Sequence, residues 1–428
     1  MKRLLLIAYY FPPLGGAESI VTVKVLRGLA EAGWKCTVLT IDPAGALADK
    51  DPALAQLVPA GTRVVGARAR ETRYLREIPR LVWPKRWPDL NAFWQVAAVR
   101  RAIELCRERQ FDVAYSRASP IAAALVGLEL KRRAGLPWVA HFSDPWHGTV
   151  YHNDFWGRRG RSAFLHVERQ VARHADLCTF ASEPMLEDAL ERLGGVLPRE
   201  RAVYLPHCYD PRLYPAKGER PDPQRSSRPL TLAHMGRFYA NRSPLALFKA
   251  MANLRAGTRP NLAEELRLEF HGGGRPRWLL SAPAAKAVAD QAAFLPASTY
   301  VESLRAMTLA DALLLIDAPA APGRPSLFFP SKLADYLGAG RPIVALTPRQ
   351  GASASILRGL TPYVAPPDDL RAIEALIVRL AEDWKSERGL CGVDPASPAV
   401  SRFELSRTTE SLAGALETAI RQAAEPRA

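Results

Sequence analysis

The chain has 428 residues, of which 48% are hydrophobic and 24% charged, which excludes a low-complexity protein and is typical of a soluble globular one. This length exceeds what one hydrophobic core usually supports, so two domains are expected. The formal net charge of +15 favours an anionic partner, which could be a nucleic acid, a nucleotide or an acidic membrane, although a genome rich in arginine would give the same charge.

Two features of the chain bear on its compartment. The five cysteines are scattered and form no Cys-x-x-Cys pair, which argues against a disulfide framework or a zinc site and favours a reducing compartment. The start, MKRLLLIAYYFPP, looks like a short signal peptide, but prolines and glycines follow where a cleavage site needs small residues. A first strand running into a glycine loop is expected instead. No apolar segment reaches the length of a transmembrane helix.

Strand and helix patterns alternate through the first half of the chain. Apolar runs predict buried strands at 4–9, 35–41, 63–67, 113–116, 138–142 and 177–181. Amphipathic stretches predict helices at 18–32, 91–109, 121–134 and 162–174. This alternation indicates a parallel sheet covered by helices on both faces.

The pattern breaks at 206–230, which contains six prolines and the charged run 217–228 and is typical of a linker. It then restarts, with strands at 230–235, 266–271, 312–316 and 343–346 and helices at 243–254, 301–310, 370–387 and 408–422. Two successive α/β sheets predict two Rossmann-like domains facing each other across a central cleft, with ligands at the carboxyl ends of the strands.

The segment FPSKLADYLGAGRPIVAL, residues 329–346, is the most informative stretch of the sequence. Ser331 is expected to cap a helix, and Gly338 and Gly340 to end it before a buried strand. Lys332 and Asp335 in the first turns suit a ligand with a charged phosphate and a sugar diol. The alternative is a solvated helix start with a surface ion pair.

Two further motifs follow strands of the first half. Gly15 and Gly16, in PPLGGAE, allow close approach of a ligand to the backbone at a helix start, although a plain tight turn would look the same. In HFSDPW, Asp144 before a proline is expected to direct a carboxylate into the cleft, and His141 could carry a proton or bond a sugar hydroxyl. The alternatives are an Asx-turn and a core histidine.

The motif GRFYANRSP lies between a strand and a helix of the second half. Gly236 begins it, and Arg237 and Arg242 bring two cations to a helix start, where an anion is needed to offset them. A diphosphate site is therefore favoured over two surface arginines.

Taken in order, these motifs resemble a bacterial GT-B-fold glycosyltransferase of the family-4-like group that builds surface polysaccharides and lipid-linked glycans. The matching stretches are YYFPPLGGAE, PDLNAFWQVAAVRRAIELCRERQFDVAYSRASP, GLPWVAHFSDPW, MGRFYANRSP and PSKLADYLGAGRPIVAL. They cover nearly the whole length, and five in order form a specific pattern.

The resemblance implies transfer of a sugar from a UDP- or GDP-linked nucleotide-sugar, with retention at the anomeric carbon and with no metal or other cofactor. It implies that Arg237 neutralises the donor diphosphate and that Asp335, matching the second carboxylate of the family's Glu-x7-Glu pair, holds the ribose diol. Arg242 lies near where many relatives have a lysine. His141, Asp144 and Arg237 are then the expected catalytic residues, and Gly15, Gly16, Gly236, Arg242, Ser331, Lys332 and Asp335 join Arg237 in donor binding.

Some positions depart from the family pattern. Leu327 stands where the first carboxylate of the pair is expected, and His141 and Ser143 replace the usual Asp and Arg before Asp-Pro-Trp. A catalytically inactive nucleotide-sugar-binding or scaffold protein therefore stays an alternative. The hypothesis of a nucleic-acid-binding protein is supported by the net charge alone. A GT-B epimerase fits the motifs less well than a family-4-like glycosyltransferase does.

The expected domains are an acceptor domain at 1–208, a linker at 209–229, a donor domain at 230–405 and a terminal helix at 406–428 packing back across both. Region 68–109 is rich in arginine and contains Trp83, Trp87 and Trp94, which suits an anionic membrane surface; single-stranded nucleic acid or a basic loop with core tryptophans are alternatives. A cytoplasmic protein, peripheral at the inner face of the membrane and near a glycan or lipid-linked acceptor, is expected, with no nucleic-acid partner.

Overall fold

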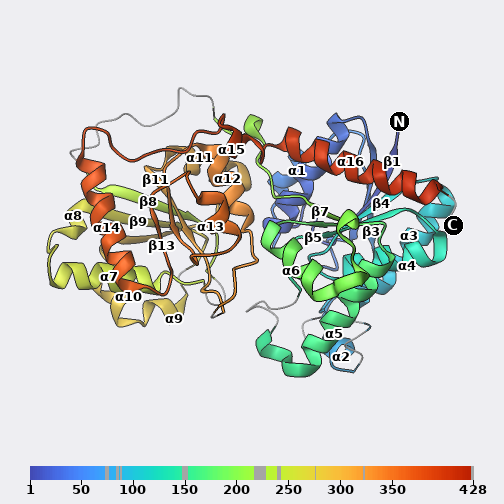
Figure 1. Ribbon diagram of the computed structural model, residues 1–428, viewed down its shortest axis with the longest axis horizontal. Coiled ribbons are helices and arrows are strands. Elements are labelled where there is room, and N and C mark those ends of the chain that lie inside the picture. Colours follow the sequence, from blue (N-terminus) through green and yellow to red (C-terminus); the bar gives the residue numbers. More distant parts are fainter. Residues whose placement is uncertain are drawn as a thin grey trace. The chain divides into compact units, whose positions relative to one another are not determined.

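Two all-parallel β-sheets organise the chain (Figure 1). The computed structural model describes residues 1–72, 77–82, 86, 89–146, 153–215, 228–238, 242–274, 276–321 and 323–425. Unit 1 comprises Met1–Cys208, Leu327–Phe329 and Leu405–Ala428, and unit 2 comprises Tyr209–Ser326 and Pro330–Glu404. The expected α/β class with two parallel sheets is confirmed.

Unit 1 contains a seven-stranded sheet in the order β3-β2-β1-β4-β5-β6-β7. Its strands are β1 (Arg3–Ile7), β2 (Lys35–Ile41), β3 (Arg63–Ala67), β4 (Val113–Arg117), β5 (Trp138–Phe142), β6 (Leu177–Phe180) and β7 (Ala202–Tyr204). Its helices are α1 (Ala17–Glu31), α2 (Glu77–Val82), α3 (Ala92–Glu108), α4 (Ala122–Ala134), α5 (Asn153–His174), α6 (Glu183–Leu193) and α16 (Leu405–Ala424).

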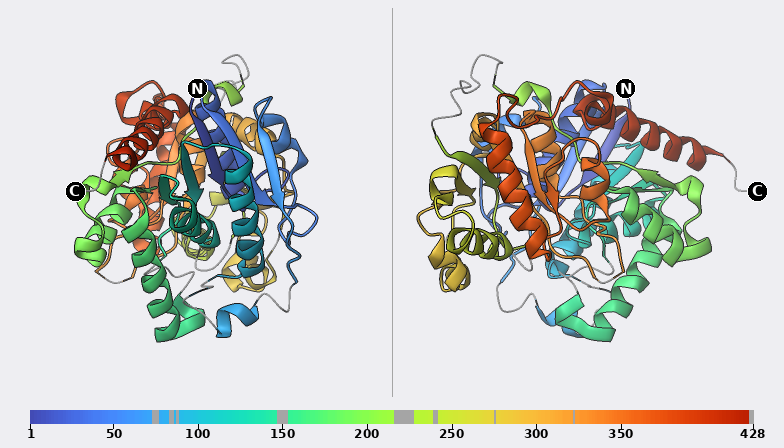
Figure 2. Two further views of the ribbon diagram at one scale, coloured as in Figure 1. Left: turned by 90° about the vertical axis from the view of Figure 1, so that its right-hand side faces the viewer. Right: turned by 60° about the vertical axis from the view of Figure 1, so that its left-hand side comes forward.

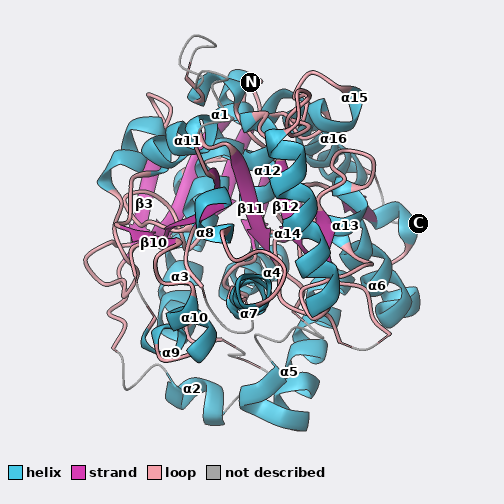
Figure 3. Cartoon of the chain, turned by 90° about the vertical axis from the view of Figure 1, so that its left-hand side faces the viewer, coloured by secondary structure: helices cyan, strands magenta, loops and turns pink. Residues whose placement is uncertain are grey.

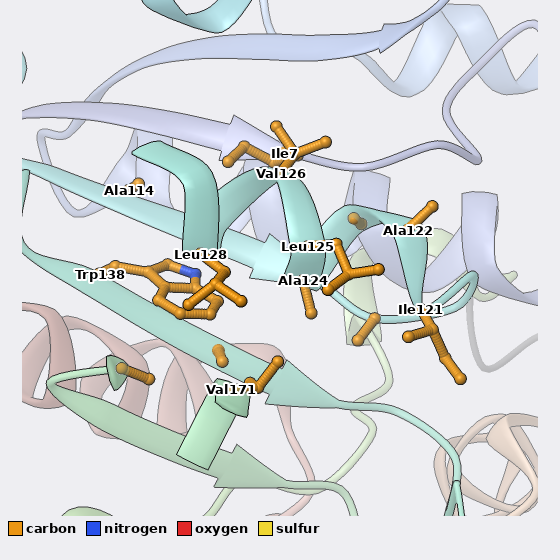
Figure 4. Packing of buried hydrophobic residues seen from close by; sticks show 14 of the residues in the cluster. Ile7, Ala114, Ile121, Ala122, Ala124, Leu125, Val126, Leu128, Trp138 and Val171 are labelled. Atoms are coloured by element: carbon orange, nitrogen blue, oxygen red, sulfur yellow. The ribbon is translucent and has the colours of Figure 1, made fainter. Parts of the chain in front are cut away.

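Alternate strand residues of unit 1 face two separate hydrophobic cores. Ile7, Ala114 and Trp138 lie on the face covered by α3, α4 and α5 (Figure 4). The opposite face, with Leu6 and Val113 among its residues, is covered by α1 and α16, which lie side by side (Figures 1 and 2). Because both faces are buried, the strands are continuous apolar runs, which is why the sequence identifies them.

A close approach of α4 to β5 depends on a glycine. A Cβ atom on Gly127 would collide with the indole ring of Trp138, whose Nε1 donates to Ser116 Oγ at 2.9 Å. The tryptophan, although fully buried, therefore keeps its polar atom satisfied while the helix packs against its ring. This packing fixes the middle of α4 against the start of β5.

Unit 2 repeats the arrangement with six strands in the order β10-β9-β8-β11-β12-β13. These are β8 (Leu230–Met235), β9 (Leu266–His271), β10 (Ala292–Leu295), β11 (Ala312–Ile316), β12 (Ile343–Leu346) and β13 (Val364–Ala365). The helices are α7 (Leu245–Ala256), α8 (Leu262–Glu265), α9 (Arg277–Leu280), α10 (Pro283–Ala287), α11 (Tyr300–Leu309), α12 (Ser331–Ala339), α13 (Ala352–Leu357), α14 (Leu370–Lys385) and α15 (Pro398–Ser401).

The core of unit 2 lies between the sheet and two helices. Leu232, Leu268 and Leu314 from three neighbouring strands pack with residues of α7 and α14, which contact each other (Figure 3). Helix α12 buries Leu333 and Tyr336, and the Tyr336 hydroxyl accepts from the backbone N–H of Met235 at 2.9 Å. This bond ties the middle of α12 to the end of β8.

Most element predictions hold within one or two residues, and some elements were missed. Strands β2, β3, β5, β8, β9 and β11 have the expected bounds, whereas α5 begins nine residues earlier than expected, at Asn153. The sequence did not predict α6, whose start is capped by Ser182, and it did not predict the edge strands β7 and β10. Residues 216–227, most of the expected linker, lie outside the described residues.

The expected ends of α12 are partly wrong. Pro330 holds the N-cap position with an extended backbone, so Ser331 is already the first helical residue and provides no side-chain cap. Gly338 lies inside the helix, where Tyr209 and Tyr214 leave no room for a Cβ. Gly340 alone ends α12, in the left-handed conformation at φ 66° that glycine adopts without strain.

Candidate functional site

Each sheet has one point at which its strand order reverses. In unit 1 the order runs outward from β1 on one side and from β4 on the other, and in unit 2 from β8 and β11. Loops leave such a pair of strands in opposite directions, so a crevice opens at their carboxyl ends, where ligands of open α/β sheets bind. The motifs that follow β1, β4, β8 and β11 are therefore the candidate site residues.

The predicted glycine turn of unit 1 follows β1 directly. Gly16 is the N-cap of α1 at φ 98°, a conformation that requires glycine, and its backbone is exposed. Gly15 donates to the Asp49 carbonyl at 2.8 Å, and a Cβ there would meet Asp51 at 3.3 Å. The turn thus presents the open N-terminus of a 15-residue helix beside the strand ends.

A buried ionic network that the sequence did not predict lies next to this turn. Arg117, at the end of β4 and 1% exposed, donates from Nε to Glu18 Oε1 at 2.9 Å. The Ser143 hydroxyl donates to the same oxygen at 3.0 Å and accepts from Arg117 Nη2 at 3.2 Å. The start of α1, the end of β4 and the loop after β5 are thereby joined by one carboxylate, and the guanidinium is satisfied inside the protein.

His141 is placed differently from its expected role. It is 1% exposed on the face covered by α1 and α16, and its Nδ1 lies 2.9 Å from Thr179 Oγ1. Burial, Arg117 and His207 hold the pKa of His141 well below its usual range. Its Nε2 has no hydrogen-bond partner among the described residues, and His141 lines a cavity of about 10 Å³, which is too small for a sugar.

Asp144 lies three residues after His141 in the same motif. It is half-buried in the loop after β5, and the neighbouring Trp146 packs against Phe142 with ring centroids 4.6 Å apart. Of the two candidate catalytic residues in HFSDPW, Asp144 is therefore the one with solvent access.

In unit 2, the GRFYANRSP motif leaves β8 through a strained turn. Gly236 has φ 101°, and a Cβ on Gly272 would lie 2.5 Å from the Gly236 carbonyl oxygen, so both positions require glycine. Arg237 is exposed at this turn, whereas Arg242 is 5% exposed with Nη2 at 3.9 Å from Asp317 Oδ1. A shallow pocket of about 200 Å³ is lined by Gly236, Arg237, Phe238, Phe270, Gly272, Gly273, Gly274 and Pro276.

Lys332 adds a third cation at this place. From the first turn of α12 its Nζ reaches His234 Nε2 at 3.2 Å, and it is so close to Gly236 that a Cβ there would lie 3.1 Å from Nζ. Burial and Arg242 lower the pKa of Lys332 to about 7 against the opposing effect of Asp317. Two guanidinium groups, the Lys332 amino group and the amino end of α12 thus lie at the carboxyl end of β8, which favours an anionic ligand.

Asp335 lies one turn further along α12 and is 5% exposed. Its Oδ1 accepts from the Tyr300 hydroxyl at 2.9 Å, and its backbone carbonyl accepts from the Tyr214 hydroxyl at 2.8 Å. The carboxylate is therefore held in one orientation by a neighbouring helix. The alternative of a surface Lys332–Asp335 ion pair does not fit these contacts, because Lys332 contacts His234 and Asp335 contacts Tyr300.

Leu327, at the position of the expected first carboxylate, is used for packing. It contacts the core of unit 1, and its backbone carbonyl accepts from the Ser182 hydroxyl at 2.6 Å. Phe329 of the same segment lies against His207, with ring centroids 5.2 Å apart.

The Arg/Trp-rich region of unit 1 divides into buried and exposed parts. Trp94 is fully buried against Tyr9, with ring centroids 5.2 Å apart. For this residue, the burial agrees with the alternative that the tryptophans lie in the core. Trp83 and Trp87 lie outside the described residues. Exposed apolar side chains occur on the neighbouring helices: Ile78, Leu81 and Val82 on α2, and Phe93 and Val96 on α3.

A groove of about 540 Å³ opens next to these helices, between α3, α4 and α5. It is lined by Arg86, Gln95, Val96, Val99, Arg100, Leu125, Leu128, Glu129, Arg132, Arg133, His166, Val167 and Gln170. Apolar residues and arginines therefore share this part of unit 1. In the described ranges, no helix combines the length and apolar character needed to cross a membrane.

Four residues of the two strand-end clusters were missed from the sequence. Arg117 and Asp317 stand at the point where an apolar strand ends, a signal that could have found them, as it found Asp144. Glu18 and His234 carry no such signal, because their partners lie 99 and 98 positions away. Across the part of the chain that the structure describes, no group of His, Cys, Asp or Glu side chains is arranged to hold a metal ion.

Comparison with known proteins places these features in a family context. Residues 15–208 match the family model described as Glycosyl transferase 4-like domain. The matched segment begins at the Gly15–Gly16 turn and includes Arg117 and the HFSDPW motif. No curated protein sequence matches the chain.

Solved structures resemble the chain over almost its full length. A sucrose-phosphate synthase from Thermosynechococcus elongatus is 16% identical, with 99% of this chain and 97% of that chain covered and a TM-score of 0.65. Anabaena HepE, solved with UDP and glucose, is 15% identical, with 98% and 100% covered and a TM-score of 0.65. WaaG, a glycosyltransferase of lipopolysaccharide biosynthesis, is 14% identical, with 99% and 95% covered and a TM-score of 0.56. At these identities the likeness shows the fold, which is GT-B.

Proposed function

The chain is a glycosyltransferase of the GT-B fold with a glycosyl transferase 4-like domain, and we propose that it moves a sugar from a nucleotide-sugar to a glycan or lipid-linked acceptor. In this proposal, unit 2 binds the donor and the first unit binds the acceptor. The observation that carries it is the convergence of Arg237, Arg242 and Lys332 with the amino end of α12 at the carboxyl end of β8.

The donor's parts are assigned to residues by their chemistry. Arg242, fixed by its burial, and the exposed Arg237 bind the diphosphate, and Asp335, oriented by Tyr300, accepts from the ribose hydroxyls. HepE was solved with UDP and glucose, which supports a UDP-linked donor; a GDP-linked donor is the other expectation.

The proposed mechanism depends on where charge develops in the transition state of sugar transfer. As the bond between the sugar and the diphosphate breaks, the sugar becomes cation-like and the leaving diphosphate gains negative charge. Fixed guanidinium groups and a helix N-terminus stabilise that charge more in the transition state than in the ground state, which lowers the barrier. These cations act where a metal would otherwise be needed, so we propose a metal-independent transfer with retention at the anomeric carbon.

On the acceptor side, we propose Asp144 as the catalytic carboxylate of unit 1. His141, as a buried neutral imidazole, supports the loop that carries it, because its pKa and its enclosed position are unsuited to proton transfer with a sugar. Gly15 and Gly16 leave the backbone of the first turn of α1 open to the ligand.

The test is a donor screen followed by substitution. Wild-type protein is expected to release a nucleoside diphosphate from one donor among UDP-, GDP- and dTDP-sugars, and that donor should raise the melting temperature by mass action. Arg237→Ala and Asp335→Ala should each lower this turnover about 100-fold, whereas Arg371→Ala, at an exposed position of α14, should not change it. Near-normal turnover in both site variants would overturn the assignment.

We also propose that unit 1 associates with an anionic membrane surface. The exposed apolar residues of α2 and α3 and the arginines lining the neighbouring groove support it. Replacing Leu81 and Val82 with serine should reduce sedimentation with anionic vesicles, and zwitterionic vesicles should bind neither protein. Equal binding of both proteins to anionic vesicles would contradict the role of α2.

A further inference from the structure

His234 has a contact pattern that fixes its protonation state. It lies near the end of β8 with its ring 1% exposed and stacked on Phe238 at 4.8 Å between centroids. Its Nδ1 lies 2.9 Å from the carbonyl oxygen of Leu314, which can only accept, so Nδ1 carries the hydrogen. Burial and Lys332 hold the pKa of His234 well below its usual range, so the ring is neutral and Nε2 carries a lone pair.

That lone pair determines where Lys332 lies. The Lys332 ammonium or amine donates to Nε2 across 3.2 Å, which holds Nζ beside the Gly236 turn, next to Arg237. A lysine side chain has four rotatable bonds and is otherwise a mobile cation. The Leu314–His234–Lys332 chain of hydrogen bonds removes that mobility before any ligand arrives.

We propose that His234 is a positioning residue that holds Lys332 for the donor diphosphate, and that Lys332 takes up a proton when the diphosphate binds. This inference rests on the proposed donor site in unit 2. It adds to that proposal one residue, His234, and a proton that accompanies the donor.

Burial and the charges around Lys332 explain why its pKa is low enough for it to take up a proton when the diphosphate binds. Arg242, in the segment after β8, disfavours the charged form of Lys332, and Asp317 after β11 favours it. Arg242 and His271, at the end of β9, also act on the neighbouring His234. His271 itself lies 3.3 Å from Glu269. With burial added, the charged form of Lys332 is destabilised relative to a lysine in water, and the pKa of Lys332 falls to about 7.

A bound diphosphate reverses this balance. Its two negative charges favour the ammonium form, so the pKa of Lys332 rises on binding and a proton enters with the ligand. From a free-site pKa of about 7, the uptake should be small at pH 6 and should approach one proton at pH 8 and above. Donor affinity should accordingly be constant below pH 6 and fall up to about tenfold per pH unit above pH 8.

The probe must not titrate by itself. A free nucleoside diphosphate has a terminal phosphate that ionises near pH 6, which would exchange protons on its own account. UDP-glucose and GDP-mannose have no such group near neutrality. They are therefore the ligands for the measurement.

The experiment is titration calorimetry of the full chain with each nucleotide-sugar at pH 7 and pH 8, in two buffers of different ionisation enthalpy. The difference in apparent heat between buffers gives the protons taken up. Wild type should show uptake that increases from pH 7 to pH 8. Lys332→Arg, which stays charged, should bind the donor with uptake close to zero, and Lys249→Met, which removes an exposed lysine of α7, should behave as wild type.

His234 is tested by two variants. His234→Phe keeps a ring that can stack on Phe238 but removes the acceptor, so the donor Kd should rise about tenfold and the KM for donor should change more than kcat. His234→Gln, which has an oxygen able to accept from Lys332, should recover part of the loss. A structural role alone would lower the melting temperature in both variants without this difference in donor affinity.

The outcomes separate the two proposals. Donor binding by wild type without proton uptake, or equal uptake by wild type and Lys332→Arg, contradicts the inference and leaves the donor site in place. Absence of binding by any nucleotide-sugar contradicts the proposed function and the inference together.

Discussion

The two sheets have the same order of strands, but their buried cations differ in how closely they approach protein acceptors at the carboxyl ends of the strands. In unit 1 the buried cation Arg117 donates to Glu18 at 2.9 Å and to Ser143, and Lys24 donates to the Cys208 carbonyl at 2.5 Å. In unit 2 the closest approach of Arg242 to Asp317 is 3.9 Å, and Lys332 donates to a neutral histidine.

We interpret this difference as a structural role for the buried cations of unit 1 and a ligand-binding role for those of unit 2. A buried cation with a full set of protein acceptors stabilises the loops that it joins, and it has little to gain from a ligand. In unit 2, Arg242 lowers the pKa of Lys332, so an anion bound beside these two side chains would relieve the repulsion between them. In our proposal, the same switch-point geometry therefore supports loop architecture in unit 1 and diphosphate binding in unit 2.

The largest expected effect is at Arg242. Arg242→Met should lower kcat/KM for the donor about 100- to 1000-fold, because it removes a fixed cation from the leaving diphosphate. The measurement is nucleoside diphosphate release with saturating acceptor. Arg242→Lys keeps the charge and should lose less. A loss below about fivefold in Arg242→Met would mean that unit 2 does not depend on this cation.

The next effect is on stability rather than on turnover. Arg117→Met breaks a buried pair and should destabilise unit 1 by about 3 kcal/mol, measured by denaturant unfolding, while the donor Kd stays unchanged. The double variant with Glu18→Gln should recover much of the loss, because no uncompensated carboxylate remains. A large change in donor affinity in Arg117→Met would remove the distinction between the two units.

The smallest expected effect sharpens the role of Asp335. Tyr300→Phe removes one hydrogen bond to its carboxylate and should cost about 1 kcal/mol of nucleotide-sugar binding, or roughly fivefold in Kd. The affinity for inorganic pyrophosphate, which lacks ribose, should not change. Tyr214→Phe is the matched control, since that hydroxyl bonds the backbone carbonyl of Asp335. Equal loss for both ligands would argue against ribose binding by Asp335.

The sequence predicts this fold well because of where the strands lie. Both sheets are parallel and covered on both faces, so their strands are uninterrupted apolar runs, as at Ile343–Leu346. Edge strands β7 and β10 are half-exposed and short, and no such run marks them. The order of the strands, and with it the switch points, depends on contacts between distant segments that no local pattern records.

The residues of the proposed site could be picked out from the sequence where one motif contains them, and not where their partners are distant in the chain. Arg237, Arg242, Lys332 and Asp335 follow strands or begin a helix, which is a local signal. His141 has the same local signal, but its side chain points to the face covered by α16, a helix that starts more than 260 residues later. A one-residue shift was enough to remove the predicted cap at Ser331, because Pro330 already occupies that position.

Amide hydrogen exchange of the full chain, with and without a saturating nucleotide-sugar, tests most directly that unit 2 binds the donor diphosphate. Donor binding should slow exchange at the end of β8 and through the first turn of α12, around Gly236 and Lys332. The β4 segment ending at Arg117 should retain its exchange rate, because its guanidinium is already satisfied by Glu18 and Ser143. Slowed exchange at β4 with none at β8 and α12 would contradict the assignment.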